Sequence, residues 1–207
     1  MFIIKKVGLQ GGVGSFNDIT FGQNYDKIKQ LIFEQISLQN DINFGDLDIK
    51  PKYLLTTQNV LRELNDKNID YGLFALLNSL GGVVLETTTC LGKYHFNFLD
   101  SFKTQISHSL MKRKDQNLKT ITQIMAHEQV FRQCKNKLTK YFPNLKQVNG
   151  IHNLTDNGSI ALALAKNELP NTAILMSPIL SKIYDLDIIQ DKLEDDEANY
   201  TTFLFVS

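Results

Sequence analysis

Residues 2–16 of the chain, FIIKKVGLQGGVGSF, decide the fold class. The apolar and β-branched run from Phe2 to Val7 predicts a strand, and the glycine-rich segment from Gly8 to Gly14 predicts the loop after it. A helix is predicted next, because apolar residues recur at its spacing at Ile28, Leu31, Ile32 and Ile36. A strand, a glycine-rich loop and a helix in this order are typical of an α/β protein.

The same alternation continues along the rest of the chain. Further strands are predicted at 52–55, 70–77, 94–99, 104–111, 121–126, 145–148, 172–176 and 201–206. Helices are predicted after the cap Thr56–Thr57, through Val130, Cys134 and Leu138, over 159–166 behind the cap Asp156 or Asn157, and from Ser177–Pro178. This order predicts parallel sheets covered by helices, and such sheets bind ligands at the carboxyl ends of their strands.

The bulk composition narrows the class of protein. The chain has 207 residues with 43% apolar and 21% charged residues, which suits one large domain or two small lobes. Lys plus Arg and Asp plus Glu are both 22, which argues against a nucleic-acid-binding protein. The tightest basic run, Lys112–Lys114, and the acidic stretch Glu194–Glu197 are both predicted to be solvated surface.

Cysteine and histidine spacing predicts no metal site. Cys90 and Cys134 show no C-x-x-C spacing and the histidines show no H-x-x-x-H spacing, so we expect reduced, mostly buried thiols. The apolar run at the amino terminus is too short for a signal peptide, and no run approaches the roughly 20 apolar residues that span a bilayer. The sequence therefore predicts a soluble, cytoplasmic protein that does not bind membranes.

Polar clusters follow several predicted strands, and each has a structural alternative. The loop 8–16, with Gly11 near its centre, suits an anion, but by itself it favours an ordinary turn. Asn78–Gly82 suits ligand contact and a turn equally. His127 is placed either to cap a helix or to reach a ligand, and a histidine at such a corner is more often structural. Residues 156–159 suit a bound carboxylate or plain capping, and residues 199–203 suit a cleft lining or an exposed edge.

The order of these clusters resembles the prephenate dehydratase family over nearly the whole chain. The family's glycine-rich loop is matched by residues 7–16, and its Glu-Asn-Ser element by Leu77–Ser79 with Gly81–Gly82. Further matches in order are His108 with Leu110, Ala126–Gln129 with Gln133–Cys134, Asp156–Gly158, and Asn199–Phe203.

The resemblance implies a fold and a reaction. The fold would be two α/β lobes of the type 2 periplasmic-binding-protein kind with an interlobe cleft, lobe 1 holding about 1–77 plus 178–207 and lobe 2 about 78–177. The reaction would convert prephenate, or arogenate, by loss of carboxylate and hydroxyl without a cofactor. The family's regulatory ACT domain is not expected, because nothing follows Ser207. Members often pair as homodimers, which no residue here supports by itself.

The resemblance also assigns roles to individual residues. Thr201 would assist the departing hydroxyl, Phe203 would pack beside the substrate, and the substrate would be oriented by Asn78, Ser79 and Gln133. Further substrate-binding positions implied are Gly11, His127, Asn157 and Thr202. The chain departs from the family where Thr202 replaces an arginine, Leu77 a glutamate, Ala126 a serine, and Asp156–Asn157 a Ser-Thr pair.

These departures leave two alternatives to a prephenate dehydratase. One is a relative with altered chemistry, such as decarboxylation of prephenate without loss of its hydroxyl. The other is a non-catalytic module that binds a small carboxylate, because fold does not determine function.

Overall fold

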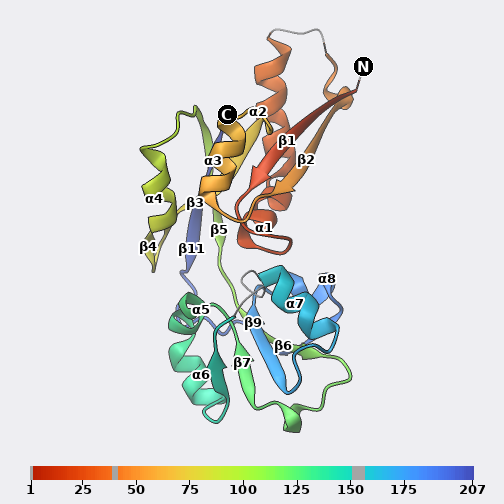
Figure 1. Cartoon of the computed structure of the whole chain (residues 1–207), viewed down its shortest axis with the longest axis vertical. Coiled ribbons are helices and arrows are strands. Elements are labelled where there is room, and N and C mark those ends of the chain that lie inside the picture. Colours follow the sequence, from red (N-terminus) through yellow and green to blue (C-terminus); the bar gives the residue numbers. More distant parts are fainter. Residues whose placement is uncertain (1, 39–41, 151–156) are drawn as a thin grey trace. The chain divides into compact units, whose positions relative to one another are not determined.

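The structure is a computed structural model that describes residues 2–38, 42–150 and 157–207. The chain divides into two compact units (Figure 1). Unit 1 comprises residues 1–12, 16–104 and 200–207, and unit 2 comprises 13–15 and 105–199. Both units are α/β structures, as expected, whereas the interlobe cleft stays a prediction because each unit is described by itself.

The unit boundaries differ from those expected from the sequence. Unit 1 continues past residue 77 to Thr104, and the carboxyl-terminal segment returns to it at Tyr200 rather than near residue 178. The reason is sheet pairing. The strand 98–105 lies beside the carboxyl-terminal strand in the sheet of unit 1, whereas the strand 186–190 pairs with the strand 109–113 of unit 2.

The sheet of unit 1 has the order β2-β1-β3-β11-β5, with β4 paired to the end of β3. Its strands are β1 (Ile3–Leu9), β2 (Leu47–Tyr53), β3 (Tyr71–Asn78), β4 (Gly82–Val83), β5 (Phe98–Gln105) and β11 (Tyr200–Val206). Strand β1 is parallel to β2 and β3, whereas β11 and β4 are antiparallel to β3. The prediction of a parallel sheet is therefore confirmed for β1, β2 and β3 and is wrong for β4 and β11.

Helices cover both faces of this sheet. One apolar core packs against α1 (Phe16–Gln23) and α2 (Tyr25–Ser37), through Phe21, Ile28 and Ile32. The other packs against α3 (Thr57–Asn65) and α4 (Leu85–Leu91), through Val60, Leu61 and Cys90. Thr56 caps α3 as predicted, because its side chain accepts the Asn59 N–H at 3.1 Å.

Unit 2 repeats this layered plan with the strand order β10-β6-β9-β7-β8. Its strands are β6 (Ser109–Arg113), β7 (Gln123–Met125), β8 (Lys146–Val148), β9 (Thr172–Met176) and β10 (Leu186–Gln190). Strand β7 is parallel to β8 and β9, whereas β6 is antiparallel to β9 and to β10. One core packs against α5 (Glu128–Gln133) and α6 (Lys135–Tyr141), and the other against α7 (Asn157–Ala165) and α8 (Ile179–Ile183), on opposite sides of the sheet in Figure 1. Single 3-10 turns lie at Phe44–Asp46 and Leu118–Thr120.

Several predicted elements are shifted or divided. The strands expected at 94–99 and 104–111 begin later in the structure, as β5 and β6. The apolar pattern misplaced β5 because its exposed side carries polar residues and only Phe102 and Thr104 are buried. The helix expected through Cys134 is two helices, since Cys134 itself leaves helical geometry at φ −116° and ψ 10°. Pro178 is the residue that precedes α8 and is not inside its first turn. The structure adds α1, α4, β4 and β10, which had not been predicted.

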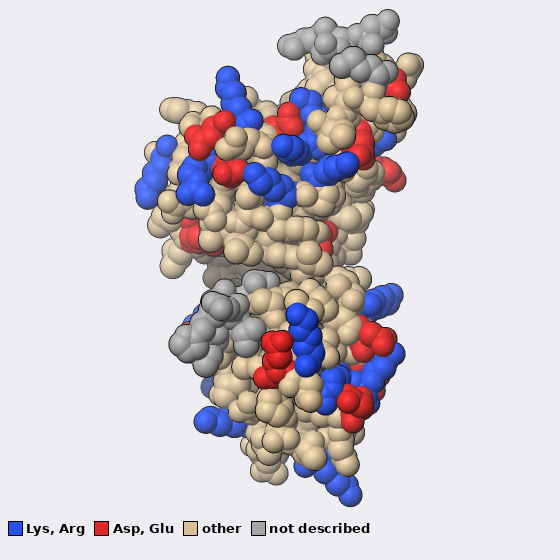
Figure 2. All heavy atoms as spheres, turned by 45° about the vertical axis from the view of Figure 1, so that its right-hand side comes forward, with Lys and Arg blue, Asp and Glu red and all other residues tan. Residues whose placement is uncertain are grey.

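Two properties of the described residues concern partners outside the chain: the distribution of surface charge and the length of the apolar helices. On the face that Figure 2 shows, Lys and Arg side chains alternate with Asp and Glu side chains. Within residues 2–38, 42–150 and 157–207 no helix is long and apolar enough to cross a bilayer. Over the same ranges no cluster of His, Cys, Asp and Glu could hold a metal ion.

Candidate functional site

In unit 1, the Thr201 hydroxyl is held by the side chain of Asn78. The Asn78 amide donates to Thr201 Oγ1 at 3.0 Å and to the Tyr200 carbonyl at 3.1 Å. The Asn78 carbonyl oxygen accepts the N–H groups of Leu80 and Gly81, which determines the orientation of the amide. Because Thr201 Oγ1 accepts from Asn78, its own hydrogen points elsewhere, and the described part of the chain offers it no acceptor.

Ser79 locks the two strands that carry this pair. Its N–H donates to the Tyr200 carbonyl at 2.8 Å, and its hydroxyl accepts the Tyr200 N–H at 2.9 Å. The register places Thr201 opposite Asn78. Ser79 therefore holds the backbone beside Thr201, and three residues predicted for the site lie together in one unit.

Thr202 and Leu77 are partners across the same two strands. The two positions at which the resemblance predicts departures, from an arginine and from a glutamate, are thus direct neighbours. Paired residues of adjacent strands project from the same face of a sheet, so the two side chains form one uncharged pair. The two predicted departures therefore fall at one place in the sheet.

Phe203 lies in the apolar core of unit 1 and not on its surface. It is 1% exposed and packs in the cluster that contains Leu73 and Phe205. Within this unit the ring packs in the core, and its contact with a substrate stays a prediction. Strand alternation explains why the ring is buried. Every second residue of β11, namely Thr201, Phe203 and Phe205, is buried.

The first N–H groups of the glycine-rich loop donate to backbone carbonyls of unit 1. Gly11 has φ +87°, a conformation that favours glycine, and its N–H donates to the Leu55 carbonyl at 3.0 Å. The Gln10 N–H donates to the Leu73 carbonyl. These two donors are therefore used within the fold, and substrate binding at Gly11 stays a prediction.

A protein carboxylate lies at this loop, which sequence reasoning had missed. Glu86 accepts the Gln10 side-chain amide at 3.0 Å and the Thr57 N–H in the first turn of α3. Helix amino termini attract anions, and here the Glu86 carboxylate accepts an N–H at the start of α3 from within the chain. Its spacing from Gln10 by 76 residues carried no signal in the sequence.

In unit 2, Gln133 is bonded to His108. The Gln133 Oε1 atom lies 2.9 Å from His108 Nε2, and His108 is 2% exposed. Glu194, also 2% exposed, accepts the His108 N–H at 2.8 Å and the Ser107 hydroxyl. The prediction of an exposed acidic loop was therefore wrong at Glu194, because distant donors solvate its carboxylate in place of water.

Burial lowers the pKa of His108, while the hydrogen bond to Gln133 and the charge of Glu194 oppose that shift. We therefore expect unfolding free energy to fall as pH falls from about 6.5, because the unfolded chain then takes up a proton that native His108 refuses. The slope would reach up to about 1.4 kcal/mol per pH unit. Denaturant titrations at several pH values below about 6.5 should show a weaker dependence of unfolding free energy on pH for His108→Gln. An unchanged dependence would contradict the shift.

The other predicted residues of unit 2 occupy helix starts. His127 is exposed and caps α5 by accepting the Gln129 N–H at 3.2 Å, which bears out its capping alternative. Asn157 is the first residue of α7, whereas Asp156 lies outside the described residues. Cys134 is buried, as predicted for both thiols, and burial raises its pKa to about 12, with the charges of Glu194 and Asp195 adding to the shift.

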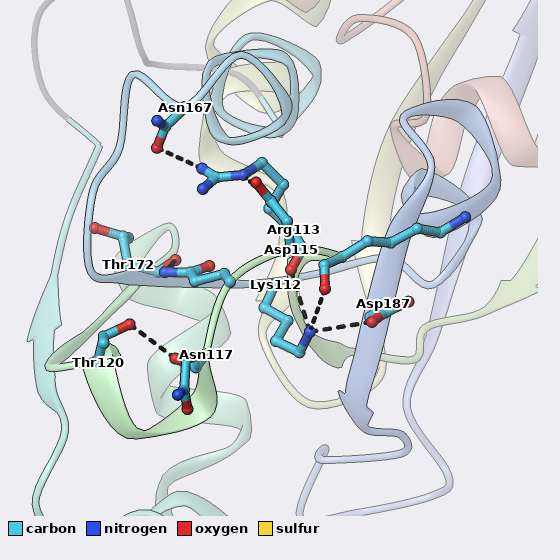
Figure 3. Close-up of polar contacts among 10 residues, drawn as sticks. Lys112, Arg113, Asp115, Asn117, Thr120, Asn167, Thr172 and Asp187 are labelled. Carbon is cyan, nitrogen blue, oxygen red and sulfur yellow. Dashed lines mark hydrogen bonds and ion pairs between the residues drawn. The ribbon is translucent and has the colours of Figure 1, made fainter.

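Each residue of the basic run Lys112–Lys114 is paired with an acid, and Figure 3 shows Lys112 directed at Asp187. Lys112 Nζ lies 3.0 Å from Asp187, and it also donates to two backbone carbonyls of its own turn. Arg113 pairs with Asp115, and Lys114 with Asp185. The charges of these three cations are therefore neutralised by neighbouring carboxylates.

Comparison with known proteins gives one consistent family. The family model described as prephenate dehydratase matches residues 7–207. Arogenate dehydratase/prephenate dehydratase 6 of Arabidopsis thaliana is 26% identical over 138 residues, covering 67% of this chain and 32% of that protein. The bifunctional chorismate mutase/prephenate dehydratase of Buchnera aphidicola is 27% identical over 153 residues, covering 74% of this chain and 38% of that protein.

A solved structure supports the fold. Prephenate dehydratase from Arthrobacter aurescens, in complex with L-Phe, superposes with a TM-score of 0.75 at 18% identity, covering 98% of this chain and 60% of that one. At this identity the likeness concerns the fold alone. The chain spans about a third of the length of the curated relatives it matches.

Proposed function

The chain belongs to the prephenate dehydratase family, and from this premise we propose that it catalyses the decarboxylating dehydration of prephenate or arogenate. The bond between the ring carbon and the carboxylate breaks, and its electrons enter the ring. The C–O bond of the ring hydroxyl breaks at the opposite carbon, and the departing oxygen takes up one proton from solvent as it leaves. Carbon dioxide and water are released, and the ring becomes aromatic. Aromatisation drives the step, and the protein has to hold the acid and assist the hydroxyl.

Thr201 is the residue that would assist the departing hydroxyl. The observation that carries this role is the 3.0 Å hydrogen bond from the Asn78 amide to Thr201 Oγ1. That bond leaves the hydroxyl hydrogen of Thr201 as a directed donor. A donor aimed at the oxygen where negative charge develops lowers the barrier of the step. Asn78 acts through Thr201, since both hydrogens of its amide are already used.

The Gln133 amide would supply a neutral donor for the substrate's acid group. An amide binds a carboxylate with uncharged hydrogen bonds, which are weaker than those of an arginine. The uncharged pair Leu77–Thr202 adds no cation to unit 1. This pair favours a second candidate function, in which carboxylate is lost but the hydroxyl stays.

Placing arginine at Thr202 should strengthen binding of the substrate. Leu77 lies opposite and cannot neutralise the new cation, so the guanidinium is left for a carboxylate. We expect KM to fall about 10-fold for Thr202→Arg, the size of one hydrogen bond to a charged group. Thr202→Met is the control of similar length without charge. An equal KM in both variants would show that position 202 does not face the acid.

Product analysis tests the proposed function. The purified chain is incubated with prephenate and with arogenate, and phenylpyruvate is followed by its enolate absorbance while phenylalanine is followed by chromatography. Either aromatic product supports the proposal. A decarboxylated product that keeps its hydroxyl supports the second candidate, and unchanged acid that nevertheless binds supports a non-catalytic binding module.

A further inference from the structure

The side chain of Gln133 is held at one end only. Its Oε1 atom is 2.9 Å from His108 Nε2. An amide oxygen accepts and never donates, so the His108 Nε2 atom carries the hydrogen of this bond. The Gln133 amide nitrogen has no hydrogen-bond partner in the described part of the chain, and the residue is half-buried. Two N–H donors are therefore left for a ligand.

A short acidic segment ties His108 and Gln133 to each other. The Leu193 N–H donates to the His108 carbonyl at 2.9 Å, and the Glu194 carboxylate accepts the His108 N–H at 2.8 Å. The next residue, Asp195, donates its N–H to the Gln133 carbonyl at 2.8 Å. Three consecutive residues thus set the distance between the histidine and the glutamine.

Asp195 extends the same support to the neighbouring helix. Its carboxylate accepts the N–H groups of Asn136 and Lys137 at 2.8 and 2.9 Å, in the first turn of α6. Asp195 therefore holds this region twice. Its N–H is bonded to the backbone at the end of α5, and its carboxylate is bonded to the start of α6. Buried hydrogen bonds that join several segments hold the side chains between them in one arrangement.

We propose that His108 and Glu194 are positioning residues that aim the amide hydrogens of Gln133 at a carboxylate or carbonyl oxygen of the substrate. This inference rests on the proposed function and adds to it two residues absent from the predicted site. An amide that is not held presents its oxygen to the ligand as readily as its nitrogen, and an oxygen repels a carboxylate. The hydrogen bond from His108 to Oε1 removes the unproductive orientation.

The first test reads the amide itself and needs no turnover. The side-chain ¹H–¹⁵N resonances of Gln133 are assigned by their loss in Gln133→Met. We expect them to be distinct from those of free glutamine in the native chain, to move to free-glutamine values in His108→Leu, and to return in His108→Gln. His108→Asn keeps a polar amide too short to reach Gln133, and it should behave as His108→Leu if that variant does not fold.

Gln116→Met is the matched control. Gln116 is also a buried polar residue of unit 2, and its amide donates to the Thr172 carbonyl at 3.2 Å at the start of β9. Its replacement removes one buried hydrogen bond without touching Gln133. Gln133 resonances that move equally in Gln116→Met and His108→Leu, or that stay in place in His108→Leu, would overturn the proposal.

The second test reads the consequence for the substrate. His108→Leu should raise KM about 10-fold, the effect of one lost hydrogen bond to a charged group, with kcat within about 3-fold. The same change made on Gln133→Met should raise KM no further, because His108 acts through Gln133. Additive effects would overturn the positioning role. A native chain that turns over neither acid would instead refute the proposed function, and the amide resonances would still decide this inference.

Discussion

Thr201→Ala is expected to lower kcat on prephenate by about 100- to 10,000-fold, the range for a lost proton donor in a transition state. The free energy of unfolding should change by only about 1 kcal/mol, because a single hydrogen bond from Asn78 is removed. Steady-state kinetics with phenylpyruvate detection, together with urea unfolding, measure both quantities. A kcat that stays within about 3-fold would remove Thr201 from the proposed chemistry.

Two variants separate the hydroxyl from the shape of the residue. Thr201→Ser keeps the hydroxyl and should retain most of the activity. Thr104→Val removes a different buried threonine hydroxyl of unit 1, one that lies 2.7 Å from the Thr20 hydroxyl. It should reduce stability and leave kcat unchanged. A loss of kcat in Thr104→Val as large as in Thr201→Ala would indicate general distortion of the unit.

Phe203→Ala is expected to destabilise the chain by about 3–5 kcal/mol, the cost of emptying a buried aromatic site. The ring is 1% exposed and is surrounded by apolar side chains from β3, β11 and the α1–α2 face. The cavity cannot collapse easily, because its walls are strands held by their hydrogen-bonded neighbours. Thermal or urea unfolding of the purified variant measures the effect.

Phe203→Leu is the companion variant. It keeps most of the buried volume and should cost less than about 1.5 kcal/mol, with KM unchanged. The combination distinguishes a core residue from a residue that packs beside the substrate. A stable Phe203→Ala variant with a raised KM would support the substrate contact that the family resemblance implied.

Both predictions concern residues of the same strand, β11. Thr201 and Phe203 are alternate residues of β11, so one strand carries both the proposed donor and an anchor in the core. The register between β11 and β3 shifts between Thr202 and Phe203. Such irregularities redirect side chains, and this one lies immediately after the two threonines.

Elements with a strong local signal were predicted well. Strand β9 has the predicted bounds, because β-branched Thr172 is followed by a continuous apolar run to Met176 and every member is buried. Strand β5 was displaced in the prediction, because Asp100, Ser101 and Lys103 interrupt any apolar pattern. Pairing between strands, and not the composition of β5, forms that element.

Local sequence was sufficient to reveal the family, since its motifs are short and occur in a definite order along the chain. It also determined the alternation of strands and helices, the cap at Thr56 and the near balance of charge. Each of these depends on residues a few positions apart.

Only the tertiary structure decided which of these residues act on each other. It buried Glu194 against donors 86 and 87 residues away, paired Thr202 with Leu77, and joined His108 to Gln133. The physical reason is that a buried polar group is tolerable only where partners meet it, and those partners come from distant segments. No local pattern in a sequence records where such segments will meet.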